Sequence, residues 1–247
     1  MSLSEINIRE KKFHNKLHSS GSERSESIFY KALHNLYEDF FYFLKNKSQN
    51  KNILDFGCGI GSYTERVLTF NPLKITAIDI SEKAINIAKD KKNNKEDKID
   101  YRVENCENTK LNSNEYDLIY GAGILHHLNL NKSMEEINRL LKKNGTLIFI
   151  EPLGTNPMIN LYRKFTPNSR SKDERPFKFR DIKYFQNLFK NVEVKYYGFF
   201  TLLFFPFYKS PENSKIFLLL SKIDKIFLKV PFFKFLAWSI LIKAEKN

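Results

Sequence analysis

Short β-like runs alternate with helix-like segments over residues 52–151, and this alternation constrains the fold more than any other feature of the sequence. Strand patterns that alternate with helical patterns are typical of a parallel sheet whose faces are covered by helices. We therefore expect an α/β fold. The expected strands lie near residues 52–56, 75–79, 100–104, 117–122 and 146–151.

The segments around these strands show helical spacing and capping residues. Ser81 can cap a helix after the second strand, and a helix before Lys142 is predicted to stop at Gly145. Further elements are expected on both sides of the alternating unit. They are a helix in the second half of residues 4–43, a helix near 181–189, a strand at 192–197 and a last strand within 235–242.

Three glycines, Gly57, Gly59 and Gly61, follow the first strand directly. Glycines allow positive φ and let a ligand approach the backbone closely. The spacing is G-x-G-x-G instead of the dinucleotide fingerprint G-x-G-x-x-G, and Asp55 just before it would repel a pyrophosphate but attract an ammonium group. Asp79 ends the next strand, where an acid can bind a ribose diol. The pattern suits a positively charged nucleoside without phosphate, and a ligand-free turn is the alternative.

From residue 52 to about 151 the chain resembles the class I S-adenosylmethionine-dependent methyltransferases. "LDFGCGIG" is similar to their glycine motif, "AIDIS" to their ribose-binding acid and "VENCEN" to their adenine-side segment, while "YDLIYGAGILHHLN" and "LLKKNGTLIFIEP" resemble their fourth and fifth strands. The resemblance implies a Rossmann-like, doubly wound, mostly parallel seven-stranded sheet, with N-terminal helices and an inserted helical cap. It also implies S-adenosyl-L-methionine as cofactor.

The resemblance also implies a set of cofactor-binding residues. Asn105 departs from the family pattern, which more often has aspartate there, although an amide carbonyl can still accept a hydrogen bond from adenine. The implied set is Asp55, Gly57, Cys58, Gly59, Gly61, Asp79, Ile80, Asn105, Cys106 and Gly121.

Three residues are candidates for proton transfer. His126 and His127 follow the fourth strand, at the edge where such sheets place their ligands, and a histidine near neutral pKa can serve as a base. We favour His127 as the residue that faces the acceptor, while one imidazole could instead cap a loop or pack on the core. Glu151, at the end of the fifth strand, is a second candidate base or a structural carboxylate.

Acceptor specificity is expected outside the five strands. The segment 152–176 is long for a connection and suggests a lid or binding loop. Its Tyr162, Arg163 and Arg170 are candidate substrate-binding residues, with Arg175 as a further cation for a carboxylate or phosphate. The alternative is that these arginines pair with acids of the lid itself. His14 and His18, in a segment that often folds over the cofactor in this family, are expected on a helix face or the surface.

The formal net charge of +13 comes from lysines scattered along the chain, which favours solvated faces over a nucleic-acid partner. The C-terminal third differs, because lysines there interleave with phenylalanine and leucine. This pattern suits an apolar cap, or peripheral contact with an anionic membrane. An alternative is a pair of amphipathic helices that bury their apolar face on the sheet. No signal-peptide pattern is seen, so we expect a cytoplasmic protein, with membrane-peripheral contact through the C-terminal third as a further option. Cys58 and Cys106 have no zinc spacing, and we predict no metal site.

We therefore predict one compact domain with a helical lid at 1–50, a cofactor-binding core at 51–151, and an acceptor-binding insert, hydrophobic cap and last strands at 152–247. The predicted function is methyl transfer to an oxygen or nitrogen of a small hydrophobic or lipid-linked acceptor. Two alternatives remain: a tRNA-base methyltransferase, and a non-catalytic partner protein that keeps the cofactor loop.

Overall fold

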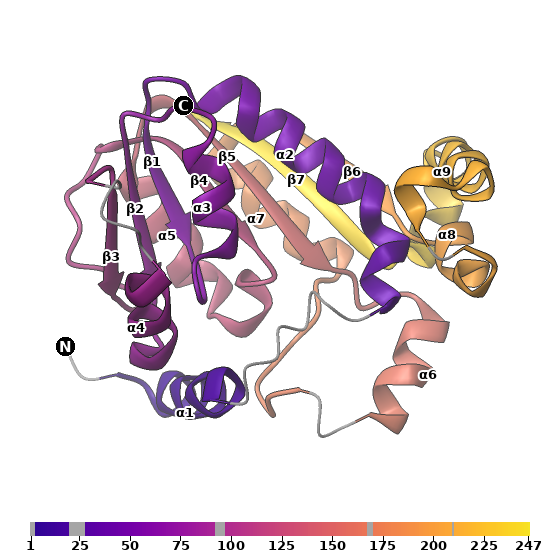
Figure 1. Ribbon diagram of the computed structural model, residues 1–247, viewed down its shortest axis with the longest axis horizontal. Coiled ribbons are helices and arrows are strands. Elements are labelled where there is room, and N and C mark those ends of the chain that lie inside the picture. The colour runs from indigo at the N-terminus through magenta and orange to yellow at the C-terminus, as the bar shows by residue number, and fades with distance from the viewer. Residues whose placement is uncertain (1–2, 20–27, 92–96, 167–169, 209) are drawn as a thin grey trace.

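The computed structural model describes residues 3–19, 28–91, 97–166, 170–208 and 210–247. Their strands form one sheet in the order β3-β2-β1-β4-β5-β7-β6, in which β1 to β5 are parallel and β7 is antiparallel to both β5 and β6. This confirms the expected mostly parallel seven-stranded sheet (Figure 1). The strands are β1 Asn52–Phe56, β2 Lys74–Asp79, β3 Ile99–Val103, β4 Tyr116–Ala122, β5 Leu141–Pro152, β6 Phe189–Tyr197 and β7 Ser239–Lys246.

Helices cover both faces of the sheet. In Figure 1, α2 and α3 lie on the face of the sheet toward the viewer, and α5 and α7 lie on the opposite face. Helices α8 and α9 lie together at the right of the view, beside the ends of β6 and β7. The α-helices are α1 Glu5–Ser19, α2 His34–Ser48, α3 Ser62–Leu68, α4 Glu82–Lys91, α5 Leu130–Leu140, α6 Pro157–Phe165, α7 Phe179–Leu188, α8 Phe200–Leu203 and α9 Lys215–Phe227. Short 3₁₀ turns are η2 Ile28–Leu33, η3 Leu125–His127, η5 Phe205–Phe207, η6 Pro211–Asn213 and η7 Pro231–Leu236.

Two apolar layers hold the helices on the sheet. Successive strand residues point to opposite faces, so Ile53 joins the layer beneath α2, α3 and α4, and Leu54 joins the layer beneath α5 and α7. Leu147 and Ile148 divide between the layers in the same way. Because helices cover both faces of the sheet, the sequences of the central strands are nearly continuous apolar runs.

One local expectation was wrong. The helix before β5 ends at Leu140, and Gly145 lies inside β5 instead of terminating that helix. The backbone turn falls on Asn144, whose φ is 59°. Leu141 already pairs with Tyr116 of β4, so the strand begins earlier than its apolar run suggested.

The carboxyl ends of the parallel strands meet at one edge of the sheet. This edge faces α1 and α6, which lie beneath it in Figure 1. Ser81, expected to cap a helix, accepts the backbone N–H of Ala84 at 3.1 Å and donates to the side chain of Asn15 on α1 at 2.6 Å. An ion pair between Lys11 and Glu82 also joins α1 to α4. The N-terminal helix is thereby fixed over the sheet edge where α/β folds bind ligands.

Candidate active site

A cavity of about 730 Å³ opens along this edge. Its walls come from the turns after β1, β2, β3 and β4, from α1 and α6, and from the C-terminal cap. Its size falls within the usual range for small-molecule sites. The cavity brings together most of the residues that the sequence nominated. They are Gly57, Cys58, Gly59, Asp79, Ile80, Asn105, Cys106, His126, His127, Tyr162, Arg163 and Arg170.

The glycine loop bends back onto β2. The backbone N–H groups of Gly57 and Cys58 both donate to the carbonyl of Ile78 at 2.9 Å. Gly57 has a φ of 83°, and a Cβ there would lie 2.5 Å from the side chain of Ile124. Only glycine fits this position, because any other residue would have to adopt an unfavourable positive φ and would place its Cβ against the side chain of Ile124.

Asp79 closes the loop from the neighbouring strand. Its carboxylate accepts the backbone N–H of Gly59 at 2.9 Å and that of Ser81 at 2.8 Å, and the residue lines the cavity. These two donors fix the orientation of an acid beside a glycine-lined surface. The arrangement fits a nucleoside whose ribose hydroxyls would bind the carboxylate and whose positively charged tail would lie along the loop.

Asn105 faces the cavity from the turn after β3. Its amide oxygen accepts the backbone N–H of Glu107 at 3.0 Å, and its amide nitrogen lies 3.5 Å from the side-chain oxygen of Asn7 on α1. The carbonyl that would accept from adenine is therefore already used locally, although a carbonyl has two lone pairs. Ile80 and Cys106 line the same end of the cavity.

Three nominated cofactor residues do not line the cavity. Asp55 is buried behind the loop and accepts hydroxyl bonds from Thr64 and Tyr120, each at 2.7 Å, so it does not face an ammonium group. Burial raises the pKa of Asp55 to about 7. Gly61 caps α3 with a φ of 80°, and Gly121 packs so tightly that a Cβ would lie 2.8 Å from the carbonyl of Phe56. All three support the loop from behind.

Glu151 also lies outside the cavity wall, where it holds the turn after β4. Its oxygens accept the backbone N–H groups of Ile124, Leu125 and His126 at 3.1, 2.8 and 3.3 Å. A further contact of 2.7 Å joins Glu151 to Nδ1 of His126. Burial raises the pKa of Glu151 to about 7, against the opposing effect of these donors. Glu151 therefore positions the His126 ring, which itself lines the cavity.

His127 points to a different carboxylate. Its Nδ1 lies 3.1 Å from Oε2 of Glu10 on α1, and its ring meets the ring of His14 edge to face at 5.1 Å. Burial and the neighbouring His126 lower the pKa of His127 to about 4, so its imidazole is neutral at neutral pH. The two histidines, adjacent in sequence, thus face different acids, Glu151 of β5 and Glu10 of α1.

Two nominated arginines lie at the mouth of the cavity. Arg163 donates to Asn160 at 3.0 Å, and Arg170 donates to the carbonyls of Arg163 and Thr166. Burial lowers the pKa of Arg163. Arg175 does not line the cavity and instead pairs with Asp181 at 3.2 Å.

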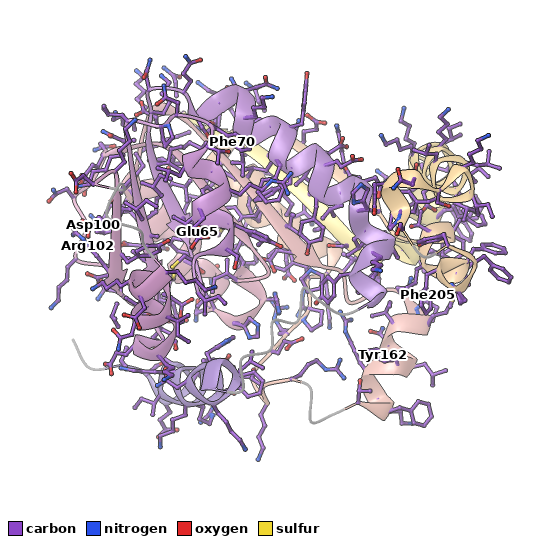
Figure 2. All side chains as sticks on the ribbon, in the orientation of Figure 1. Glu65, Phe70, Asp100, Arg102, Tyr162 and Phe205 are labelled. Atoms are coloured by element: carbon purple, nitrogen blue, oxygen red, sulfur yellow. The ribbon has the colours of Figure 1, made fainter. Side chains whose placement is uncertain are left out.

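The end of the cavity farthest from β3 is apolar. Tyr162 of α6 and Phe205 of η5 lie at this end, while Asp100 and Arg102 mark the opposite edge of the sheet (Figure 2). The remaining apolar wall consists of Met158, Ile159, Leu202, Leu203 and Trp238.

Comparison with known proteins places this architecture in a family. Residues 54–149 match the family described as "Methyltransferase domain". Over these residues the chain carries a methyltransferase domain. It resembles a ubiquinone biosynthesis O-methyltransferase of Pelagibacter ubique at 34% identity over 121 residues, which cover 48% of this chain and 49% of that relative. It resembles a malonyl-[acyl-carrier protein] O-methyltransferase of Bacillus cytotoxicus at 30% over 152 residues, covering 61% and 50%.

The chain thus spans about half the length of these curated relatives. A solved structure, geranyl diphosphate C-methyltransferase from Streptomyces coelicolor A3(2), superposes with a TM-score of 0.68 and covers 100% of both chains at 12% sequence identity. This likeness confirms the predicted fold class over the full chain.

The cavity wall includes polar residues that sequence reasoning missed. Asn7 and Glu10 of α1 line the cavity, and Glu174 joins them from the segment before α7. One signal was present, since Glu10 and His14 are four residues apart on one helix and so share a face. The side chain of His18 lies outside the described residues.

Proposed function

We propose that this methyltransferase domain transfers a methyl group from S-adenosylmethionine to an oxygen or nitrogen of a small hydrophobic or lipid-linked acceptor. The observation that carries the proposal is the continuous cavity, whose one end has the glycine loop and Asp79 and whose other end is apolar. A polar cofactor and an apolar acceptor would meet between them, beside His126. Both curated relatives described above are named O-methyltransferases, which supports an oxygen acceptor.

At the cofactor end, Asp79 would accept the ribose hydroxyls, with Asn105, Cys106 and Ile80 around the adenine. The loop from Gly57 to Gly59 would lie under the methionine part. The sulfonium supplies an already electrophilic methyl group when bound, so the chain needs to provide alignment and a water-poor site.

For proton removal we propose His126, although the sequence favoured His127. The Nδ1 atoms of both rings face a carboxylate, but the 2.7 Å contact of His126 is shorter than the 3.1 Å separation of His127 from Glu10. The partner of His126, Glu151, also holds the backbone of the same turn. A carboxylate bonded to one ring nitrogen favours the tautomer in which the other nitrogen accepts a proton. Glu151 would act as a positioning residue for His126.

The acceptor would enter past α6 and the C-terminal cap. Tyr162 would contact its apolar part, and Arg163 and Arg170 at the mouth would contact an anionic or polar head group. Nucleic acid fits this wall less well, because aliphatic and aromatic side chains dominate it.

The cap around this entrance exposes many large apolar side chains. On α9 these are Ile216, Leu218, Leu219, Ile223 and Ile226, and nearby they include Phe165, Phe207 and Phe232. Exposed lysines are interleaved with them at 215, 222, 225 and 229. Within the described residues, no helix is long and apolar enough to cross a membrane. We propose that this surface rests on an anionic bilayer, with apolar tips inserted and lysines at the head groups.

Calorimetry with S-adenosylhomocysteine tests the cofactor site. Asp79→Ala should weaken binding about 10- to 100-fold, because hydrogen bonds to a charged group contribute roughly 1.5–3 kcal/mol. Asp100→Ala is the matched control, since Asp100 lies on the next strand, outside the cavity, and pairs with Arg102. No binding by the wild type, or equal loss in both variants, would contradict the cofactor assignment.

Methyl transfer from labelled S-adenosylmethionine to a lipid extract and to a tRNA pool tests the acceptor class. Label in the lipid fraction supports the proposal, and label in tRNA favours the alternative enzyme. Cofactor binding without transfer to either pool would favour a non-catalytic partner protein.

Vesicle sedimentation tests the membrane surface. Wild type should bind vesicles containing phosphatidylglycerol, and Leu219→Glu with Ile226→Glu should reduce that binding at least tenfold. Leu73→Glu is the matched control, because Leu73 is equally exposed before β2, away from the cap. Equal binding by the double variant and the wild type would overturn the proposed contact.

A further inference from the structure

Three metal-binding side chains converge where α1 crosses the turn after β4. Oε2 of Glu10 lies 3.1 Å from Nδ1 of His127 and 3.5 Å from Nε2 of His14. All three ligand atoms lie within 4.8 Å of one another. Ligands that bind one Zn²⁺ at about 2.0–2.2 Å lie roughly 3.3–3.6 Å apart when arranged tetrahedrally. The separation of 3.5 Å falls in that range, and the separation of 3.1 Å lies just below it.

Glu10 and His127 of this cluster are buried, and within the described ranges each has one polar atom without a hydrogen bond. The side chains of Glu10 and His127 are each 5% exposed. Among the described residues, Oε2 of Glu10 and Nδ1 of His127 are nevertheless buried atoms without a hydrogen bond of acceptable geometry. Buried polar atoms without partners are uncommon in native proteins, because their desolvation is then uncompensated. These two atoms face each other at 3.1 Å, close enough for both to contact one ion bound beside them.

We propose that Glu10, His14 and His127 bind one divalent transition-metal ion, with Zn²⁺ as the best match. Imidazole nitrogens with a carboxylate oxygen are the ligand set that Zn²⁺ and its neighbours prefer, whereas Mg²⁺ and Ca²⁺ prefer all-oxygen sites. A lysine or arginine would be the other way to compensate these atoms. In the described part of the chain, no ion pair joins Glu10 to such a cation.

A hydrogen bond from outside the cluster orients one of the three side chains. Ser171 donates to the other oxygen of Glu10, which is the outer-shell bond that commonly orients a metal-binding carboxylate.

The site would join two parts of the fold. Glu10 and His14 belong to α1, and His127 belongs to η3 beside the glycine loop. A bound ion would therefore tie the N-terminal helix over the cavity. Because three protein ligands leave a coordination position open, and all three residues line the cavity, that position would be accessible to water or to an oxygen of the acceptor. The metal proposal stands independently of the cofactor.

Direct metal binding tests the proposal. The full chain without an affinity tag is freed of metal with a chelator and titrated with Co²⁺, whose visible absorption reports nitrogen and oxygen ligation, and then with Zn²⁺ as competitor. The wild type should bind one equivalent. Glu10→Gln and His14→Asn should each weaken Zn²⁺ binding at least tenfold, because each removes one ligand of three.

The matched control is His34→Asn. His34 forms a similar i,i+4 pair with Glu38 at 3.4 Å, but on α2 and outside the cluster, so its loss should leave metal affinity unchanged. Thermal unfolding provides a second measurement: Zn²⁺ should raise the unfolding temperature of the wild type and of His34→Asn, but not that of His14→Asn, whose half-buried ring can be replaced without a cavity in the core. Equal Zn²⁺ affinity in the wild type and His14→Asn, equal loss in the control, or selective binding of Mg²⁺ would overturn the proposal.

Discussion

Gly59 donates its backbone N–H to the carboxylate of Asp79 across 2.9 Å, so the glycine loop of β1 and the acid of β2 form one unit. The two residues are 20 positions apart, and parallel pairing of the strands brings them together at the sheet edge. A loop closed by an acid offers a ligand both backbone surface and a charged acceptor. The cofactor end of the cavity therefore depends on the loop geometry as much as on the carboxylate.

Replacing Gly57 by alanine tests the loop. We expect a loss of roughly 1–3 kcal/mol of unfolding free energy, since Gly57 has a φ of 83° and its Cβ would lie 2.5 Å from Ile124. S-adenosylhomocysteine binding should weaken as well. Gly123→Ala is the control that separates backbone strain from a steric clash. Gly123 also has a positive φ, of 69°, but an added Cβ would lie no closer than 3.6 Å to another atom. Chemical denaturation should therefore show a smaller loss for Gly123→Ala, and equal losses would contradict the role of Ile124.

Glu151→Gln tests the positioning of His126. Glutamine keeps the volume but has one acceptor oxygen, so it cannot satisfy the three backbone donors and also hold the His126 ring. We expect kcat to fall about 100-fold with the acceptor found in the lipid screen, as for loss of general-base assistance. Cofactor affinity should change little, because Glu151 does not line the cavity.

Glu107→Gln is the control for that experiment. Glu107 is another buried carboxylate of the same region, which accepts the backbone N–H of Asn129 at 2.8 Å. An equal fall in kcat in both variants would assign the effect to general loosening of the turn.

The raised pKa of Asp55 predicts that the stability of the fold depends on pH. Burial raises its pKa to about 7 in the folded chain, well above the ordinary value of about 4 expected after unfolding. Between these values the folded chain binds more protons than the unfolded chain, so the Asp55 contribution to stability falls as pH rises. The difference in unfolding free energy between wild type and Asp55→Asn should be larger at pH 5 than at pH 8, by at most about 3 kcal/mol, since about two of the three pKa units fall within this pH range.

Asp117→Asn should give the opposite sign. Bonds from Lys142 and from the backbone of Asn52 outweigh burial and lower the pKa of Asp117, so its contribution is present above pH 4 and is lost in acid. Denaturation curves at several pH values would measure both variants. A wild-type advantage over Asp55→Asn that grows with pH would contradict the Asp55 prediction.

Asp224→Ala tests how the apolar cap is held. The Asp224 carboxylate accepts backbone N–H groups of Phe199, Phe200 and Thr201, so it joins α9 to the start of α8. Leaving these buried donors without an acceptor should cost about 1–3 kcal/mol of unfolding free energy. Hydrogen exchange should show the largest increase in α8. Glu212→Ala, at an exposed position of the same cap, should be neutral, and equal effects in both variants would rule out the anchoring role.

The sequence by itself determined the alternation of strands and helices over residues 52–151 and the glycine loop, but it missed α1 and α6. These features are local, because apolar periodicity, Gly57 and the capping Ser81 act within a few residues of chain. The strand positions near 52–56, 75–79 and 117–122 were therefore predicted closely. Gly145 was misread, because pairing of Leu141 with Tyr116 overrode a local helix-stop signal.

Only the tertiary structure decided which side chains share the cavity. In the sequence, Asp55 and Asp79 are both acids near strand ends. In the structure, hydrogen bonds from Thr64 and Tyr120 hold Asp55 behind the loop, whereas the backbone N–H of Gly59 holds Asp79 in the cavity. Likewise Glu10 lies 117 residues before His127, and only the packing of α1 across the sheet edge brings them to 3.1 Å. Contacts between distant segments depend on how whole elements pack, and a linear pattern records only its own neighbours.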